Sequence, residues 1–91
     1  MYRIIFTEEA QKDLQMLQRK APHTLKKLKS LLIELQEHPR IGTGQIEQLK
    51  YYEEATWSRR INKEHRLVYR IYDDVVEVLV LSTYGHYSKI D

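Results

Sequence analysis

The strongest constraint on the fold is a pair of strand-like segments that only two residues separate. Residues 65–72 and 75–83 are both rich in aliphatic, aromatic and β-branched side chains, and Asp73 and Asp74 lie between them. Such segments favour β-strands, and aspartate tolerates the positive φ angles of a tight turn. The sequence therefore predicts an antiparallel hairpin with a two-residue loop.

This hairpin divides its side chains between two faces, because successive residues of a strand point to opposite sides of a sheet. A two-residue loop pairs Arg70 with Glu77 and Arg66 with Leu81, and it places both arginines on one face. The other face is apolar and must meet the core; its members are Leu67, Tyr69, Ile71, Val76, Val78 and Val80. The arginine face then looks away from the core.

A third strand-like segment, residues 55–62, precedes the hairpin and leads into a turn at residues 62–64. The length of that turn decides which arginine shares the face of Arg66. A three-residue loop places Arg60 opposite Arg66, whereas a two- or four-residue loop places Arg59 on that face. The residues of the turn are compatible with both registers.

The first half of the chain predicts one strand and two helices. Residues 2–6 form a short β-branched and aromatic segment, and Thr7 is a suitable N-cap for a helix over about residues 8–19. Leucines spaced three and four apart predict a second helix, which ends before Pro39 and has three lysines off its apolar stripe. The stripe is expected to face the core and consists of Leu25, Leu28, Leu32 and Leu35.

Residues 39–46 contain Gly42 and Gly44, but neither a third glycine nor the Lys-Ser/Thr of a Walker motif follows. We therefore interpret this segment as an ordinary loop. No repeat or linker interrupts the chain. We expect residues 1–91 to form one domain of the α+β class, in which an N-terminal strand and a two-helix hairpin pack on a twisted antiparallel sheet.

Composition excludes several classes of protein and site. With 91 residues the chain is too short for a TIM barrel, and without cysteine it forms neither disulfides nor a thiolate metal site. The longest apolar run, residues 78–81, is far below membrane-spanning length, so we expect a cytoplasmic protein with no membrane contact. The net charge is only +2, but residues 57–70 hold five basic groups and one acidic group.

This basic segment combines arginines with aromatic residues, a combination that suits single-stranded RNA. Guanidinium groups bind phosphate through paired hydrogen bonds, and aromatic rings stack on unpaired bases. The aromatic candidates are Trp57, Tyr69, Tyr84 and Tyr87.

Two blocks of the sequence carry a specific resemblance. Trp-Ser-Arg-Arg-Ile at 57–61 and Glu-His-Arg-Leu-Val-Tyr at 64–69, together with Glu47 and the pair His86-Tyr87, resemble YoeB-type toxins of the RelE superfamily over nearly the whole chain. The resemblance implies a RelE/YoeB-like fold of the microbial-RNase kind. It also implies the activity of a type II toxin–antitoxin system toxin, which is ribosome-dependent cleavage of messenger RNA in the A site.

The same resemblance implies the partners of the protein. We expect a YefM-like cognate antitoxin, contact with the ribosome and mRNA, and binding of operator DNA only in complex with the antitoxin. A homodimer is compatible with the family, and no cofactor is implied.

The family's functional positions fall on five residues, with Lys50 as a weaker neighbour: Glu47, Arg60, Arg66, His86 and Tyr87. Metal-independent RNA cleavage needs a base for the 2′-hydroxyl, a cation for the phosphorane and an acid for the leaving 5′-oxygen. Glu47 is the candidate base, Arg60 and Arg66 the phosphate clamp and His86 the candidate acid, and Tyr87 is a stacking or positioning group. The expected product is a 2′,3′-cyclic phosphate. Contacts with RNA are further expected from Lys50, Arg59 and Trp57.

Three expectations complete the site. His65 lies at a turn and is assigned a structural role, and the spacing of the histidines matches no metal-ligand pattern. Strict alternation would put His86 on the face opposite Tyr87, so we expect Gly85 to bend the chain. The alternative function is a RelE/ParE-fold module that inhibits a protein or RNA target without catalysis, but such a module needs no acid and base around an arginine pair.

Overall fold

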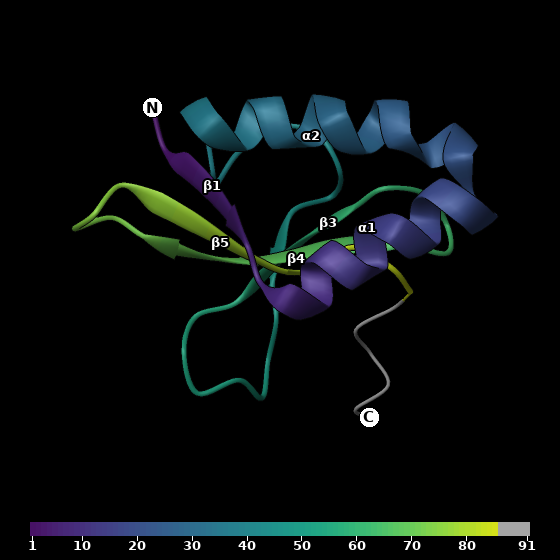
Figure 1. Ribbon diagram of the computed structural model, residues 1–91. Coiled ribbons are helices and arrows are strands. Elements are labelled where there is room, and N and C mark those ends of the chain that lie inside the picture. Colours follow the sequence, from purple (N-terminus) through teal and green to yellow (C-terminus); the bar gives the residue numbers. More distant parts are fainter. Residues whose placement is uncertain (86–91) are drawn as a thin grey trace.

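Two helices cover one face of a five-stranded sheet in the computed structural model, which describes residues 1–85 (Figure 1). Along the chain the elements are β1 (Arg3–Phe6), α1 (Glu8–Lys20), the short 3-10 helix η1 (Pro22–Thr24), α2 (Leu25–Glu37), β2 (Glu47–Gln48), β3 (Trp57–Arg60), β4 (Arg66–Tyr72) and β5 (Glu77–Ser82). The expected α+β class, with a strand and two helices before the main sheet, is confirmed.

The strand order in the sheet is β1-β5-β4-β3-β2. β1 lies parallel to β5, whereas all other neighbours are antiparallel. The sheet was expected to be purely antiparallel, but it is mixed. The two helices follow β1 along the chain, and β5, the last strand, is the one that pairs with β1, in the parallel direction. The two-residue strand β2 was not predicted, since so short a segment has no periodicity to detect.

The start of α1 and the end of α2 follow from local chemistry. The Thr7 hydroxyl accepts a hydrogen bond from the backbone N–H of Ala10 at 3.0 Å, as expected of an N-cap. The acidic side chains of Glu8 and Glu9 then occupy the first turn of α1, where the helix dipole favours negative charge. α2 ends at Glu37, two residues before Pro39, and the predicted stop is confirmed.

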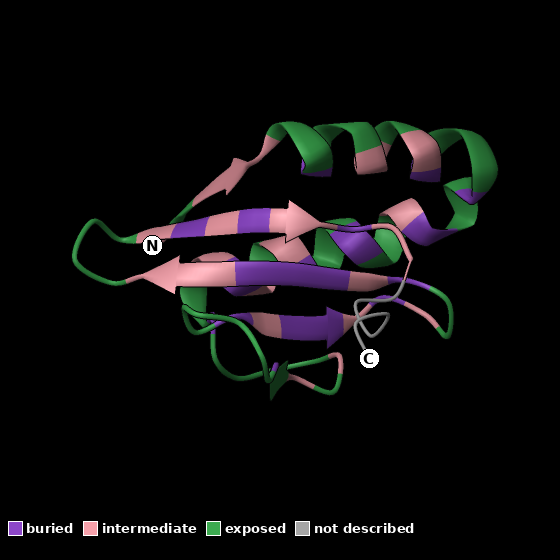
Figure 2. Ribbon diagram, turned by 90° about the horizontal axis from the view of Figure 1, so that it is seen from below, coloured by how far each residue is buried: buried purple, intermediate pink, exposed green. Residues whose placement is uncertain are grey.

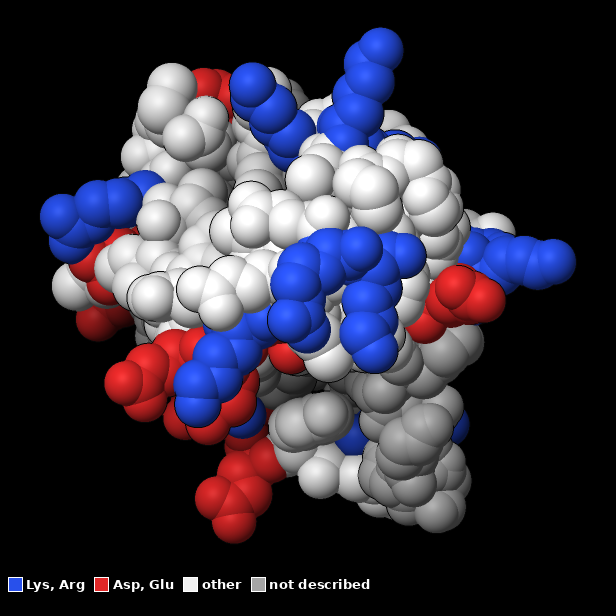
Figure 3. All heavy atoms as spheres, turned by 45° about the vertical axis from the view of Figure 1, so that its right-hand side comes forward, with Lys and Arg blue, Asp and Glu red and all other residues white. Residues whose placement is uncertain are grey.

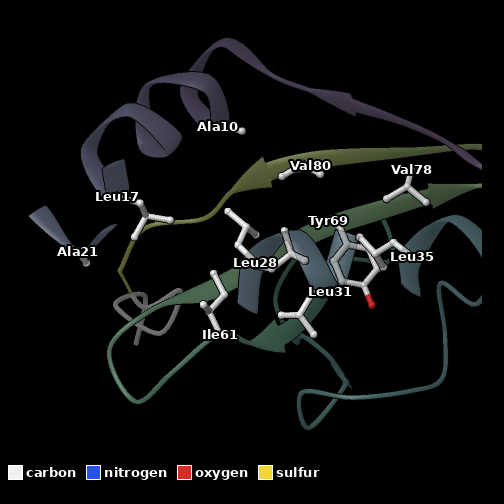
Figure 4. Close-up of a cluster of buried hydrophobic side chains, with 11 residues drawn as sticks. Ala10, Leu17, Ala21, Leu28, Leu31, Leu35, Ile61, Tyr69, Val78 and Val80 are labelled. Carbon is white, nitrogen blue, oxygen red and sulfur yellow. The ribbon is translucent and has the colours of Figure 1, made fainter. Parts of the chain in front are cut away.

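The core lies between the helices and the sheet, and Figure 4 shows how the buried side chains from both layers converge. The helices contribute Ala10, Leu17, Leu28, Leu31 and Leu35, and the sheet contributes Leu67, Tyr69, Val78 and Val80. In Figure 2 the buried residues follow the central strands while the exposed residues occupy the loops and the outer helix faces. The predicted apolar face of the hairpin is confirmed except for Val76, which is 44% exposed.

Val76 is exposed because it belongs to the hairpin loop, which is longer than predicted. Tyr72 pairs with Glu77, so four residues rather than two form the loop, and Val76 has a φ of +55°. Arg70 consequently lies opposite Leu79 and not Glu77. A shift of two residues keeps these side chains on their predicted faces, since the side-chain period of a strand is also two.

The side chain of Arg59 ties β3 to the segment that follows α2. It points to the helix side of the sheet, has no exposed surface and forms an ion pair with Glu34 at 2.8 Å. The guanidinium also donates to the carbonyl oxygens of His38 at 2.6 Å and Ile41 at 2.9 Å, and to the hydroxyl of Tyr69 at 3.2 Å. A buried cation needs such partners because it has lost its hydration.

Residues 38–44, which we call the arginine loop, wrap around this side chain. The Glu34 carboxylate accepts hydrogen bonds from the backbone N–H and the hydroxyl of Thr43, both at 2.8 Å. These bonds and the neighbouring Arg59 lower the pKa of Glu34 below its ordinary value. A Cβ at Gly42, whose φ is +125°, would clash with the Glu34 carboxylate, so glycine suits this position of the loop.

We predict that Arg59→Ala lowers the free energy of unfolding by about 3 kcal/mol or more, because it leaves Glu34, two backbone carbonyls and the buried Tyr69 hydroxyl without their donor. The matched control is the adjacent Arg60→Ala, expected to cost less than about 1 kcal/mol because its side chain lies on the open face. Urea unfolding followed by the fluorescence of Trp57, the only tryptophan, measures both. Equal losses for the two variants would contradict the anchoring role of Arg59.

A second prediction concerns pH. The folded-state pKa of Glu34 is lowered, so its contribution to stability is present above its unfolded pKa and is lost as pH falls through the folded pKa. Asp73 also has a lowered pKa, so wild type alone does not isolate Glu34. We expect the difference in unfolding free energy between wild type and Glu34→Gln to shrink as pH falls from about 7 to about 3. A difference independent of pH would be inconsistent with this assignment.

Candidate functional site

Three of the candidate residues, Glu47, Arg60 and Arg66, lie on the face of the sheet opposite the helices. Glu47 pairs with Ser58, which pairs with Val68 on β4, and Arg60 pairs directly with Arg66. Paired residues of neighbouring strands share a face, and so do residues two apart on one strand. Glu47, Arg60 and Arg66 therefore lie on one face, in two cross-strand rows that are about 7 Å apart.

The turn between β3 and β4 settles which arginine faces solvent. The backbone N–H of Ile61 donates to the carbonyl of His65 at 3.0 Å, so the loop between them has three residues. The side-chain oxygen of Asn62 accepts from the backbone N–H groups of Glu64 at 2.8 Å and His65 at 2.9 Å. This Asn62-centred turn selects the three-residue register and places Arg60 beside Arg66.

The described hydrogen-bond partners of the two guanidinium groups are neutral. Arg66 donates from Nη1 to the carbonyl oxygens of Asn62 at 2.9 Å and His65 at 3.3 Å. Arg60 donates to the same Asn62 carbonyl and to the amide oxygen of Gln45, at 3.3 and 3.4 Å. These partners orient the arginines without neutralising them. Like charges directly opposite each other are unfavourable, so the pair is suited to an anion placed between them.

Glu47 reaches this face through a close backbone contact at Gly44. The carbonyl of Gly44 accepts a hydrogen bond from the backbone N–H of Arg60 at 2.5 Å. Gly44 has a φ of +104°, and a Cβ there would lie 3.1–3.3 Å from atoms of Arg59 and Arg60. The residue must be glycine for both reasons, and the contact brings the chain alongside β3 just before Glu47.

The predicted bend at Gly85 is confirmed by its φ of +81°. Its carbonyl accepts from the backbone N–H of Arg66 at 3.1 Å, and its N–H donates to Nδ1 of His65 at 2.9 Å. The chain is thereby held beside the arginine pair at the last described residue. His86 and Tyr87 lie outside the described residues, so their assigned roles stay predictions.

His65 has the structural role that the sequence suggested. Its side chain is buried, its ring stacks on Tyr84 with centroids 4.7 Å apart, and its Nδ1 accepts the hydrogen bond from Gly85. It therefore holds the end of the described chain against the turn rather than facing solvent.

Three candidate RNA contacts lie on the helix side of the sheet, and one of them, Tyr69, is fully buried in the core. Arg59 has no exposed surface, so the prediction that it contacts RNA is wrong; its charge serves the arginine loop instead. Trp57 is half-buried, shares the helix side with Tyr69 and packs against the core. Lys50 is exposed just after β2, as a contact with RNA requires.

One group near this face was missed. Arg70 donates from Nε to the hydroxyl of Thr56 at 3.1 Å and approaches the Glu54 carboxylate at 3.8 Å, and the Tyr72 hydroxyl donates to Glu54 at 2.9 Å. These contacts fasten the segment between β2 and β3 to β4. These contacts were missed because the predicted two-residue loop paired Arg70 with Glu77. In the structure Glu77 forms an ion pair with Arg3 on β1.

Among residues 1–85, no group of three or more His, Asp or Glu side chains is arranged to hold a metal ion. None of the helices in the described part of the chain is long and apolar enough to cross a membrane.

Comparison with known proteins identifies the family. Residues 6–87 match the family described as the YoeB-like toxin of bacterial type II toxin–antitoxin systems. The chain belongs to this family. It is therefore a YoeB-type toxin of the RelE superfamily, as the resemblance implied.

Relatives with this fold cover nearly the whole chain. Toxin YoeB of Synechocystis is 38% identical over 96% of this chain and 99% of its own length. The YoeB/ParE toxin from Agrobacterium tumefaciens has 30% identity and a TM-score of 0.85, and covers 93% of this chain and 99% of that one. YoeB from Staphylococcus aureus, solved in a heterotetrameric YoeB–YefM complex, has 33% identity and a TM-score of 0.78, with coverage of 96% and 99%.

We predict that Gly44→Ala in this YoeB-type toxin destabilises the fold far more than Gly85→Ala. Both glycines have positive φ, but a Cβ at Gly85 meets no atom of the other described residues within 4 Å, whereas one at Gly44 crowds β3. The two variants therefore share the backbone strain and differ only in the close approach. Thermal unfolding followed by circular dichroism tests this, and a Gly85→Ala loss as large as that of Gly44→Ala would contradict it.

Proposed function

We propose that this YoeB-type toxin is a metal-independent endoribonuclease that cleaves ribosome-bound mRNA in the A site. The observation that carries the proposal is the direct pairing of Arg60 with Arg66 on the face that also holds Glu47. Two neighbouring cations suit a phosphate that gains negative charge in the transition state, and a carboxylate on the same face suits the proton transfer that starts the reaction.

The reaction proceeds by attack of the 2′-oxygen on the adjacent phosphorus. Glu47 accepts the 2′-hydroxyl proton as the new P–O bond forms, and Arg60 and Arg66 hold the charge of the pentavalent phosphorane. His86 donates a proton to the 5′-oxygen as its bond to phosphorus breaks. The products are a 2′,3′-cyclic phosphate and a free 5′-hydroxyl. Tyr87 stacks on the RNA.

The charge distribution supports a ribosomal setting in the cytoplasm. Residues 14–33, at the junction of α1 and α2, carry five Lys or Arg and no acidic residue. Figure 3, which turns this junction forward, shows Lys and Arg side chains projecting over the helix side of the molecule. A local basic surface suits a phosphate-rich partner, while the net charge of +2 provides only a weak overall field for capturing free RNA.

The partners follow from the staphylococcal relative, which is known both as a dimer and in complex with YefM. We propose a YefM-like antitoxin for this chain, with acidic segments that complement its basic surfaces. Operator DNA is bound only by the toxin–antitoxin complex, and a homodimer is compatible with the toxin alone.

We predict that Glu47→Ala, Arg60→Ala, Arg66→Ala and His86→Gln each lower the rate of ribosome-dependent cleavage by about 10²–10³-fold, the usual cost of one group that stabilises a transition state. Arg3→Ala is the matched control, because Arg3 is an exposed arginine on the distant edge strand β1. Primer extension on a translated message, with and without ribosomes, locates and quantifies the cuts.

Primer extension together with a growth assay of the same variants separates the two candidate functions. Cuts inside the reading frame that require ribosomes and vanish in these variants support the nuclease. Growth arrest that persists in Glu47→Ala and His86→Gln, without any cut in wild type, would favour a binding module that acts without catalysis.

A further inference from the structure

The segment between β2 and β3, residues 49–56, forms a closed loop on the side of the sheet opposite the helices (Figure 1). The backbone N–H of Leu49 donates to the carbonyl of Thr56 at 2.7 Å, one step beyond the last pair of the β2–β3 ladder. Both residues are buried. The contacts of Arg70 with Thr56 and Glu54 fasten the second half of the loop to β4.

Tyr51 stands out in this fastened loop. It has a φ of +68°, in the left-handed region that residues with a Cβ rarely adopt, and it is 91% exposed. The neighbouring Tyr52 is 39% exposed. The contacts that fasten the loop involve other residues and do not cover the ring of Tyr51. The left-handed backbone conformation of Tyr51 is unfavourable, yet its ring gains no burial. Backbone strain of this kind is typical of functional sites.

The position of Tyr51 relates it to the arginine pair. Leu49 lies opposite Thr56, two residues along each strand from the Glu47–Ser58 pair, so the base of the loop shares the face of Glu47. Tyr51 follows Glu47 by four residues, so their Cα atoms are at most about 14 Å apart. Arg60 lies about 7 Å further along the sheet than the Glu47–Ser58 pair, on the side away from the loop. An extended RNA strand whose phosphate Arg60 and Arg66 hold can therefore place a base a few nucleotides away beside Tyr51.

We propose that Tyr51 stacks on a nucleobase of the RNA whose phosphate Arg60 and Arg66 hold, and that it positions the strand for cleavage. The inference rests on the proposed ribonuclease function. Stacking requires only an exposed aromatic face, which every base can match. The exposed Lys50 beside Tyr51 offers a cation for the phosphate of a stacked nucleotide, which suits RNA.

The test uses ribosomes programmed with an mRNA that carries 2-aminopurine at successive positions around the A-site codon and 2′-deoxy sugars at the cleavage position. Stacking quenches 2-aminopurine, so wild-type toxin is expected to quench it at one position. Tyr51→Ala should abolish that quenching and lower the single-turnover cleavage rate of the all-RNA message at subsaturating toxin by about tenfold or more. Tyr51→Phe should retain both, because the ring remains, and Tyr52→Ala is the matched control in the same loop.

The outcomes distinguish this inference from the function on which it rests. If wild type cleaves, Arg66→Ala does not, and Tyr51→Ala quenches and cleaves like wild type, the stacking role is overturned while the nuclease stands. If wild type does not cleave and Arg66→Ala makes no difference, the proposed function itself fails. If Tyr51→Ala weakens only the YefM-like antitoxin complex and leaves quenching intact, the ring serves a protein partner and the inference is wrong.

Discussion

The buried guanidinium of Arg59 is the contact on which the rest of the arrangement depends. A cation without water must be met by acceptors, and here Glu34 and the arginine loop supply them. Satisfying Arg59 therefore fixes the path of the chain between α2 and β2. That path ends in the contact of Gly44 with β3, and three residues later the chain presents Glu47. The candidate base is positioned by an arginine on the other side of the sheet.

Local patterns predicted most of the fold. Periodicity and capping located both helices and all strands but β2, and the predicted apolar face of the hairpin is the core face because a two-residue error in register preserves side-chain direction. The arginine register was open to sequence reasoning because turn length depends on the side-chain contacts of Asn62, which no pattern encodes. The same holds for Arg59, since a charged residue on an alternating strand reads as exposed unless its distant partners are known.

The site combines a rigid part and a fastened part. Arg60 and Arg66 lie on paired strands, and both guanidinium groups donate a hydrogen bond to the carbonyl oxygen of Asn62. Glu47 and the loop after it lie at the sheet edge, tied down by Gly44 at one end and by Arg70 at the other. Pre-organised cations cost little to reorient when charge develops on a phosphate, so a position on two paired strands suits the role proposed for Arg60 and Arg66.

The neighbours Arg59 and Arg60 show how one dipeptide can serve two purposes. Strand alternation sends the first side chain into the core and the second to the open face. The inner arginine uses the several donors of its planar group to satisfy a carboxylate, backbone carbonyls and a tyrosine hydroxyl, a set that the compact ammonium of lysine cannot reach from one position. Among the described residues the outer arginine has neutral acceptors only, which suits the phosphate binding proposed for it. The buried anchor and the proposed phosphate-binding group are thus adjacent residues, and the length of a single turn decides which of the two faces the core.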